Sequence, residues 1–161
     1  MPGTRTTSWL PQAAAGATSL ERVFGLVPAT HDAYRELDAA LWDPALVDPA
    51  LVELCRLRVA QLVGCDAELP VRHEEARAAG LDDAKIDELR RWPTSPLYSD
   101  ADRAVLNFAE KFVVDASSVD DHDCAALRAH LSDPEIAALT TAMALFDAMA
   151  RFQIALGVDD R

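Results

Sequence analysis

The side chains able to do chemistry gather in one short stretch of the sequence, from residue 53 to residue 73. This stretch holds carboxylates at Glu53 and Glu68, a thiol at Cys65, a guanidinium at Arg72 and an imidazole at His73. Carboxylates and imidazoles transfer protons, a thiolate attacks electrophiles, and a guanidinium binds carboxylates. The stretch therefore predicts either an acid–base site or a thiol site that acts on a small molecule.

The spacing within this stretch suggests a site for an anion. Glu68 and Arg72 are four residues apart and share one face if the segment is helical. Asp66 is suited to cap that helix, which would place Cys65 at a helix N-terminus, where backbone N–H groups favour a thiolate and attract anions. We therefore expect Arg72 to hold the carboxylate of an anionic substrate.

Each of these residues also has a purely structural interpretation. Glu68 and Arg72 are compatible with a surface ion pair, Cys65 with an inert buried thiol, and His73 with a solvent-facing side chain. Glu53 lies on a helix that is apolar on every side, and an unpaired buried charge costs several kcal/mol. An ion pair with Arg56 at i, i+3 would satisfy it equally well, so both interpretations remain open.

The elements that position these residues are predicted to be helices. Capping residues, prolines and helical spacing delimit them, and no stretch alternates with period two as a half-buried strand would. We expect one all-α domain over residues 18–161, preceded by a lead-in at 1–17. The predicted helices run from Thr18 to before Pro28, over 31–42, 48–63, 66–80, 82–90, 99–114 and 120–131, and from 132 to Gly157.

Composition limits the possible partners and the compartment. The 161 residues carry a net charge of -12, which argues against nucleic acid and against an anionic membrane surface. Three cysteines are too few for a disulfide framework, which indicates a reducing compartment, and we expect a cytoplasmic protein. We expect no metal and no cofactor, because His122 and His130 lack ligand spacing and no phosphate-binding loop occurs.

Two helices are too apolar to be buried by a small domain alone. The predicted helix over 51–63 is apolar all round, and the last helix has only Asp147 and Arg151 as charges between Ile136 and Leu156. We therefore expect a second copy of the chain to cover part of this surface, in a homo-oligomer.

The stretch ELCRLRVAQLVGCDAELPVRHEEARAAGL at 53–81 resembles the core hairpin of the carboxymuconolactone decarboxylase family, including its alkyl hydroperoxidase D-like branch. In that branch a Glu is followed twelve positions later by Cys-x-x-Cys and then by a His. Glu53 and Cys65 match, Glu68 occupies the place of the second cysteine, and Arg72 that of the histidine, with His73 next to it. KIDELRRWPTSPLYSDADRAVLNFAEKF at 85–112 is similar to the second helical pair of the family.

The resemblance implies an all-helical alkyl hydroperoxidase D-like fold that assembles as a dimer, trimer or hexamer. In the peroxidase branch two cysteines cycle between dithiol and disulfide. Glu68 cannot replace the second sulfur, and Cys55 lies ten residues from Cys65, roughly 15 Å away along a straight helix. A dithiol peroxidase is therefore not expected.

Three hypotheses follow. The first is a cofactor-free lyase or isomerase that uses acid–base chemistry on a small organic acid or lactone. In it Glu53 is the base, Arg72 binds the substrate, and Glu68 or His73 donates a proton. The second is a single-cysteine peroxidase that uses Cys65 and an external thiol. The third is a non-catalytic oligomeric binding protein. We place the first ahead because the missing second cysteine weakens redox cycling most.

Overall fold

The structure, a computed structural model, describes residues 8–10 and 16–158, so most of the expected lead-in at 1–17 lies outside the described residues. Within these ranges the fold is all-helical and contains no strand, as predicted. Two 3-10 turns, at Leu89–Arg91 and Ala116–Ser118, join some of the helices. The helices are α1 (Ser19–Phe24), α2 (Pro28–Leu41), α3 (Pro49–Val63), α4 (Glu74–Ala78), α5 (Asp83–Asp87), α6 (Asp100–Asp115), α7 (Asp121–Arg128) and α8 (Asp133–Leu156).

Local capping signals set most of the helix starts. The side chains of Thr18, Ser99 and Asp120 begin α1, α6 and α7, because each accepts a hydrogen bond from a first-turn N–H. At the start of α8 the Glu135 carboxylate accepts hydrogen bonds from the backbone N–H and the hydroxyl of Ser132. The predicted start of α2 is wrong, because α2 begins at Pro28 and not at residue 31. Proline is well tolerated at the first helical position, so Pro28 opens this helix and does not interrupt it.

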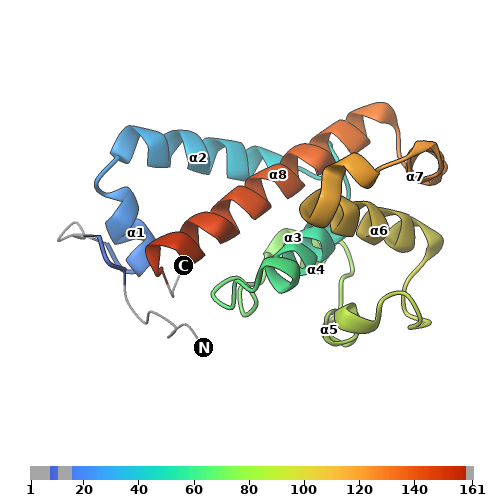
Figure 1. Ribbon diagram of the computed structural model, residues 1–161, viewed down its shortest axis with the longest axis horizontal. Coiled ribbons are helices and arrows are strands. Elements are labelled where there is room, and N and C mark those ends of the chain that lie inside the picture. The colour runs from blue at the N-terminus through green and yellow to red at the C-terminus, as the bar shows by residue number, and fades with distance from the viewer. Residues whose placement is uncertain (1–7, 11–15, 159–161) are drawn as a thin grey trace.

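Helix α3 is the centre of the fold. It packs against α8 on one side and against α6 on another, and α8 runs diagonally through the molecule beside it (Figure 1). Every residue from 51 to 57 is buried, as its all-round apolar sequence predicted. Arg58, also on α3, is part-buried and pairs with Glu110 of α6 through its Nη2, at 2.6 Å. The charges that α3 carries are therefore held by partners inside the domain.

The helix expected over 66–80 is wrong, since only Glu74–Ala78 is helical. Gly64 ends α3 in the left-handed region, at φ 76°, and the chain turns back along α3. Pro70 has no N–H to offer a helix and restricts the residue before it. The backbone oxygens of Glu68 and Val71 accept hydrogen bonds from Arg56, and a continuous helix would have used them internally. Residues 65–73, here called the return segment, are therefore turns and extended chain.

Helix α2 packs less closely than the other long helices, α3, α6 and α8. Only Leu41 of its residues is buried, whereas Leu37 is 42% exposed. Its inner face lies along α8, and the Phe24 ring of α1 stacks on the Tyr34 ring, with centroids 5.4 Å apart. In the part of the chain that the structure describes, no helix is both long and apolar enough to cross a membrane.

Candidate active site

One guanidinium joins α3 to the return segment. Arg56 Nε and Nη2 donate to the two oxygens of Glu53, both at 2.8 Å. Nη1 donates to the Glu68 backbone oxygen at 2.8 Å and to Glu68 Oε2 at 2.9 Å, and Nη2 also donates to the Val71 backbone oxygen at 2.7 Å. These are five hydrogen bonds, one for each N–H that a guanidinium carries.

The three charged side chains of this cluster are nearly inaccessible to water. Glu53 and Arg56 are each 1% exposed and Glu68 is 5% exposed. Buried ions are tolerated where partners satisfy them, and Gln153 of α8 adds a further donor, since its amide nitrogen bonds Glu68 Oε1. The expected ion pair between Glu53 and Arg56 is thus present, and it extends to Glu68 as a triad.

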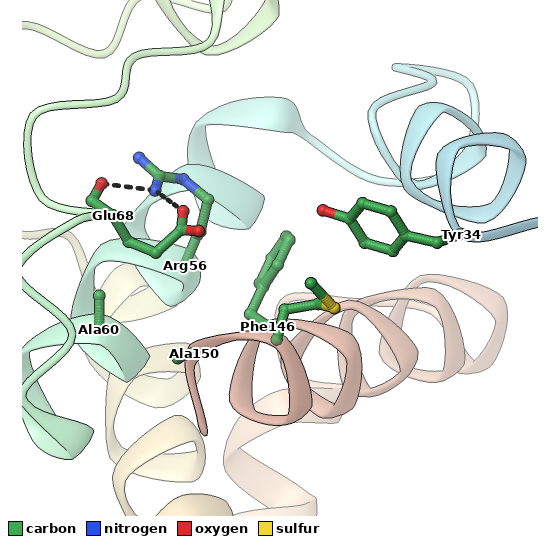
Figure 2. A pocket seen from close by; sticks show the side chains of 7 residues that line it. Tyr34, Arg56, Ala60, Glu68, Phe146 and Ala150 are labelled. Carbon is green, nitrogen blue, oxygen red and sulfur yellow. Dashed lines mark hydrogen bonds and ion pairs between the residues drawn. The ribbon is translucent and has the colours of Figure 1, made fainter. Parts of the chain in front are cut away.

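A small pocket opens beside this triad (Figure 2). It contains about 240 Å³ of empty space, with the open solvent at its mouth included. Its walls are mostly apolar, with Arg56 and Glu68 of the triad at one side. The lining residues come from α2, α3, the return segment and α8: Tyr34, Arg56, Ala60, Glu68, Phe146, Met149 and Ala150.

The two carboxylates predicted for the site have different surroundings. Glu68 lines the pocket, whereas Glu53 does not and has both oxygens held by Arg56. Glu68 also shares no helix face with Arg72, because the return segment is not helical, and its cationic partner is Arg56. The predicted i, i+4 pair is therefore wrong, although Glu68 itself does face a cavity.

Cys65 does not lie at a helix N-terminus. It follows the C-terminal end of α3, directly after Gly64, and it is 2% exposed. Burial, together with the nearby Glu68 charge, raises the pKa of the Cys65 thiol. The expected environment for a thiolate and for anion binding is therefore wrong, and the surroundings of Cys65 favour the neutral thiol.

Arg72 and His73 lie outside the set of residues that line the pocket. Arg72 Nη1 donates to the backbone oxygens of Leu69 at 2.5 Å and of Val71 at 2.7 Å, so it fastens the return segment. The His73 ring stacks on Trp42, with centroids 3.7 Å apart and planes at 9°. Both side chains are thus held by contacts outside the pocket lining, and their expected substrate-binding and proton-donating roles stay predictions.

The other cysteines offer Cys65 no disulfide, since all three thiols are free. Cys55 is fully buried on α3, and burial raises its pKa. Cys124 is exposed on α7, a helix that packs against α6 and α8. A dithiol centre is thus absent from the described part of the chain.

One group of side chains away from the pocket has the composition of a metal site. Ligand atoms of Asp120, His122 and Asp123 lie within 4.8 Å of one another at the start of α7. Asp123, however, accepts hydrogen bonds from Lys111 at 2.5 Å and Asn107 at 2.8 Å, and the Lys111 bond is the main reason that its pKa falls to about 2. Asp120 caps the helix. These contacts give the cluster a structural role in joining α7 to α6.

Sequence reasoning missed the residues that the pocket takes from α2 and α8. Tyr34, Phe146 and Met149 fit the apolar spacing of their helices and carried no signal of their own. Gln153 did carry a signal, because it is an amide on an otherwise apolar helix. The structure buries this amide, and a buried amide requires a polar partner.

Comparison with known proteins identifies the family. The profile of the Carboxymuconolactone decarboxylase family matches residues 28–111, which is just over half of the chain. The chain belongs to the carboxymuconolactone decarboxylase family. That match includes α2, α3 and the return segment, and so contains Tyr34 and the whole triad but not the lining residues of α8.

One curated protein and one solved structure resemble this chain in sequence or in fold. YnjA of Escherichia coli is 31% identical over 106 residues, which are 65% of this chain and 58% of YnjA, so the match spans less than two thirds of that relative. A protein of unknown function from Agrobacterium tumefaciens, suggested to be the antioxidant defence protein AhpD, has a TM-score of 0.74 at 24% identity. Its match covers 86% of this chain and 94% of the other.

A second solved structure of similar fold is the debrominase Bmp8. Its apo form matches with a TM-score of 0.76 at 17% identity, over 89% of this chain and 77% of Bmp8. Bmp8 is also known in complex with 2,3,4-tribromopyrrole, as a cysteine-to-alanine variant, at 16% identity to this chain. At these identities the structural likeness shows a shared alkyl hydroperoxidase D-like fold. Membership of the carboxymuconolactone decarboxylase family supports the broad interpretation of the chain as an enzyme of that family.

Proposed function

We propose that this member of the carboxymuconolactone decarboxylase family is a cofactor-free enzyme that moves a proton on a small lactone. The observation that carries the proposal is the position of Glu68. Among the described residues that line the pocket it is the one carboxylate, and it faces the cavity with a guanidinium and an amide holding its two oxygens. A positioned carboxylate of this kind acts as a general base and then as a general acid.

Glu68 is a better proton carrier than Glu53, which sequence reasoning placed in that role. Arg56 holds Glu53 through two parallel hydrogen bonds, a geometry that fixes a carboxylate and orients its partner. In this proposal Glu53 positions Arg56, and Arg56 positions Glu68. Glu53 is thus a positioning residue.

The proposed step removes a proton from carbon. Glu68 takes the ring hydrogen of an unsaturated lactone as a proton, and the C–H electron pair delocalises through the C=C bond onto the carbonyl oxygen. Return of the proton to the same or another ring carbon completes an exchange or an isomerisation. Decarboxylation of a related lactone would leave the same enolate after loss of CO₂, with Glu68 supplying the proton.

The test is hydrogen exchange in D₂O, followed by ¹H NMR, with 5-methyl-2(5H)-furanone as the probe. The wild-type protein should accelerate the loss of the C5 hydrogen signal. The Glu68→Gln variant should lose about 10²–10⁴-fold of that acceleration, because an amide cannot accept the proton. Gln is close in size to Glu and keeps an oxygen for Arg56, which favours retention of the fold.

The matched control is Asp66→Asn, a carboxylate-to-amide change at an exposed residue of the return segment. This variant should keep the wild-type exchange rate. Equal exchange rates in wild type and Glu68→Gln would refute the role of Glu68, and an absence of wild-type acceleration would refute the proposed function.

A further inference from the structure

Gln153 brings an amide from α8 to the buried triad. Its nitrogen donates a hydrogen bond to Glu68 Oε1, while Arg56 Nη1 of α3 donates to Glu68 Oε2 at 2.9 Å. Gln153 is 1% exposed, so this contact is shielded from water, and a hydrogen bond to an ionised group is strong in such surroundings. Each oxygen of the Glu68 carboxylate is thus held by a donor from a different helix.

The carbonyl oxygen of the same amide is an unpaired acceptor. Within the part of the chain that the structure describes, the buried Gln153 Oε1 has no hydrogen-bond partner. Buried polar atoms are nearly always paired, so an orphaned acceptor beside a proton carrier requires an explanation. Reversal of the amide would not help while Glu68 is ionised, because two oxygens without a hydrogen would then face each other. The charge of Glu68 therefore determines which end of the amide faces it.

A proton on Glu68 changes this relation. Arg56 directs an N–H at Glu68 Oε2, so the proton belongs on Glu68 Oε1, the carboxylate oxygen that Figure 2 draws without a dashed line to Arg56. A protonated oxygen is a hydrogen-bond donor and needs an acceptor. A half-turn of the Gln153 amide about its last C–C bond presents the orphaned carbonyl oxygen to it. The oxygen and nitrogen ends of an amide are similar in size, so the turn displaces little of the surrounding core.

We infer that Gln153 is a positioning residue that follows the proton of Glu68. Its amide donates to Glu68 while the carboxylate is ionised, and it turns to accept from Glu68 once the carboxyl is protonated. This inference rests on the proposed function, in which Glu68 takes up and returns a proton. The amide makes one hydrogen bond to Glu68 in each state, so neither state loses the contact with α8.

The turn of the amide is tested in the wild-type protein alone. The Glu68 carboxyl carbon and the Gln153 side-chain amide are followed by ¹³C and ¹⁵N NMR while the pH is lowered, with Glu68→Gln and Gln153→Met assigning the two signals. The Gln153 amide signals should shift with the same pH midpoint as the Glu68 carbon. An amide that does not respond when Glu68 titrates would overturn the inference, and so would a Glu68 that stays ionised at every pH at which the protein is folded.

Gln153→Met removes the amide at nearly unchanged side-chain length. The pH at which Glu68 is half-protonated should rise by about one unit, because the ionised form loses a charge-assisted hydrogen bond and the acid form loses a weaker, neutral one. The matched control is Gln61→Met, at a glutamine of α3 that bonds Arg58, and it should leave this pH unchanged. An unchanged midpoint in Gln153→Met, or an equal rise in both variants, would contradict the inference.

Exchange of the C5 hydrogen of 5-methyl-2(5H)-furanone separates this inference from the proposed function. At saturating lactone, Gln153→Met should exchange about tenfold more slowly, with a pH profile displaced upward by the same one unit and little change in lactone affinity. A loss of affinity with an unchanged rate and pH profile would mean that Gln153 only supports the pocket, which contradicts the inference.

The remaining outcomes distinguish the two claims. If the wild type exchanges no hydrogen while both NMR results hold, the proposed function fails and the coupling of Gln153 to Glu68 stands. If Glu68→Gln abolishes exchange while the Gln153 amide does not respond to pH, the proposed function stands and the inference fails.

Discussion

At the scale of single residues, Glu53 and Glu68 bond the same Arg56 guanidinium but differ in their access to the pocket. Glu53 matches the family pattern and lies on an apolar helix, so sequence alone made it the strongest candidate for a catalytic base. In the structure both oxygens of Glu53 accept hydrogen bonds from Arg56, whereas Glu68 lines the pocket. Sequence could not decide between them, because the direction of Glu68 depends on how the return segment folds back along α3.

The thiol of Cys65 provides a prediction at this scale. Iodoacetamide at neutral pH should label the exposed Cys124 of the native protein and leave Cys65 and Cys55 unmodified, as read by peptide mass spectrometry. The reason is that both buried thiols have raised pKa values, so the reactive thiolate is scarce and inaccessible.

The same chemistry separates the acid–base proposal from a peroxidase. Peroxide consumption with an external thiol should be equal in wild type and in Cys65→Ser. Rapid labelling of Cys65, or a loss of peroxide consumption in Cys65→Ser, would favour the single-cysteine peroxidase instead.

At the scale of helices, the prediction from sequence succeeded where local signals decide and failed where a tertiary contact decides. The bounds of α3 and α8 follow from an N-terminal proline and a C-terminal glycine, and both were predicted closely. The return segment has helical spacing, but Arg56 takes two of its backbone oxygens and Pro70 lacks an N–H. A contact between residues far apart in the chain thus overrode the local pattern.

The contact of Arg56 with the return segment should be important for stability. Arg56→Gln should lower the free energy of unfolding by about 3–5 kcal/mol, because it leaves two buried carboxylates without their cation. Urea unfolding followed by circular dichroism measures this change.

Arg58→Gln is the matched control on the same helix. Arg58 is part-buried and pairs with Glu110, whose side chain is 32% exposed, so its replacement should cost about 1 kcal/mol or less. Similar losses in the two variants would show that the triad contributes no more than an ordinary ion pair.

At the scale of the whole molecule, the exposed face of α2 lacks a covering element. Apolar side chains of α2 and of the turns that flank it are exposed, and the helix itself buries only Leu41. We propose that a second copy of the chain covers this surface. The sequence predicted such a copy over the apolar helices at 51–63 and 136–156, but residues 51–57 are already buried within the domain. The exposed apolar residues are Leu26, Val27, Leu37 and Leu46.

Light scattering coupled to gel filtration tests this assembly. The wild-type protein should be an oligomer, and Leu37→Glu should shift it towards the monomer, because a buried charge at an interface is costly. Val114→Glu, at an exposed apolar residue at the end of α6, should leave the mass unchanged. A wild-type monomer at micromolar concentration would contradict the proposal.

The most direct test of the whole account is the rate at which the protein exchanges the C5 hydrogen of 5-methyl-2(5H)-furanone in D₂O, compared between wild type and Glu68→Gln. The account predicts a wild-type acceleration that falls by at least about 10²-fold in the variant while the fold is retained. Exchange at the same rate in both proteins would contradict it.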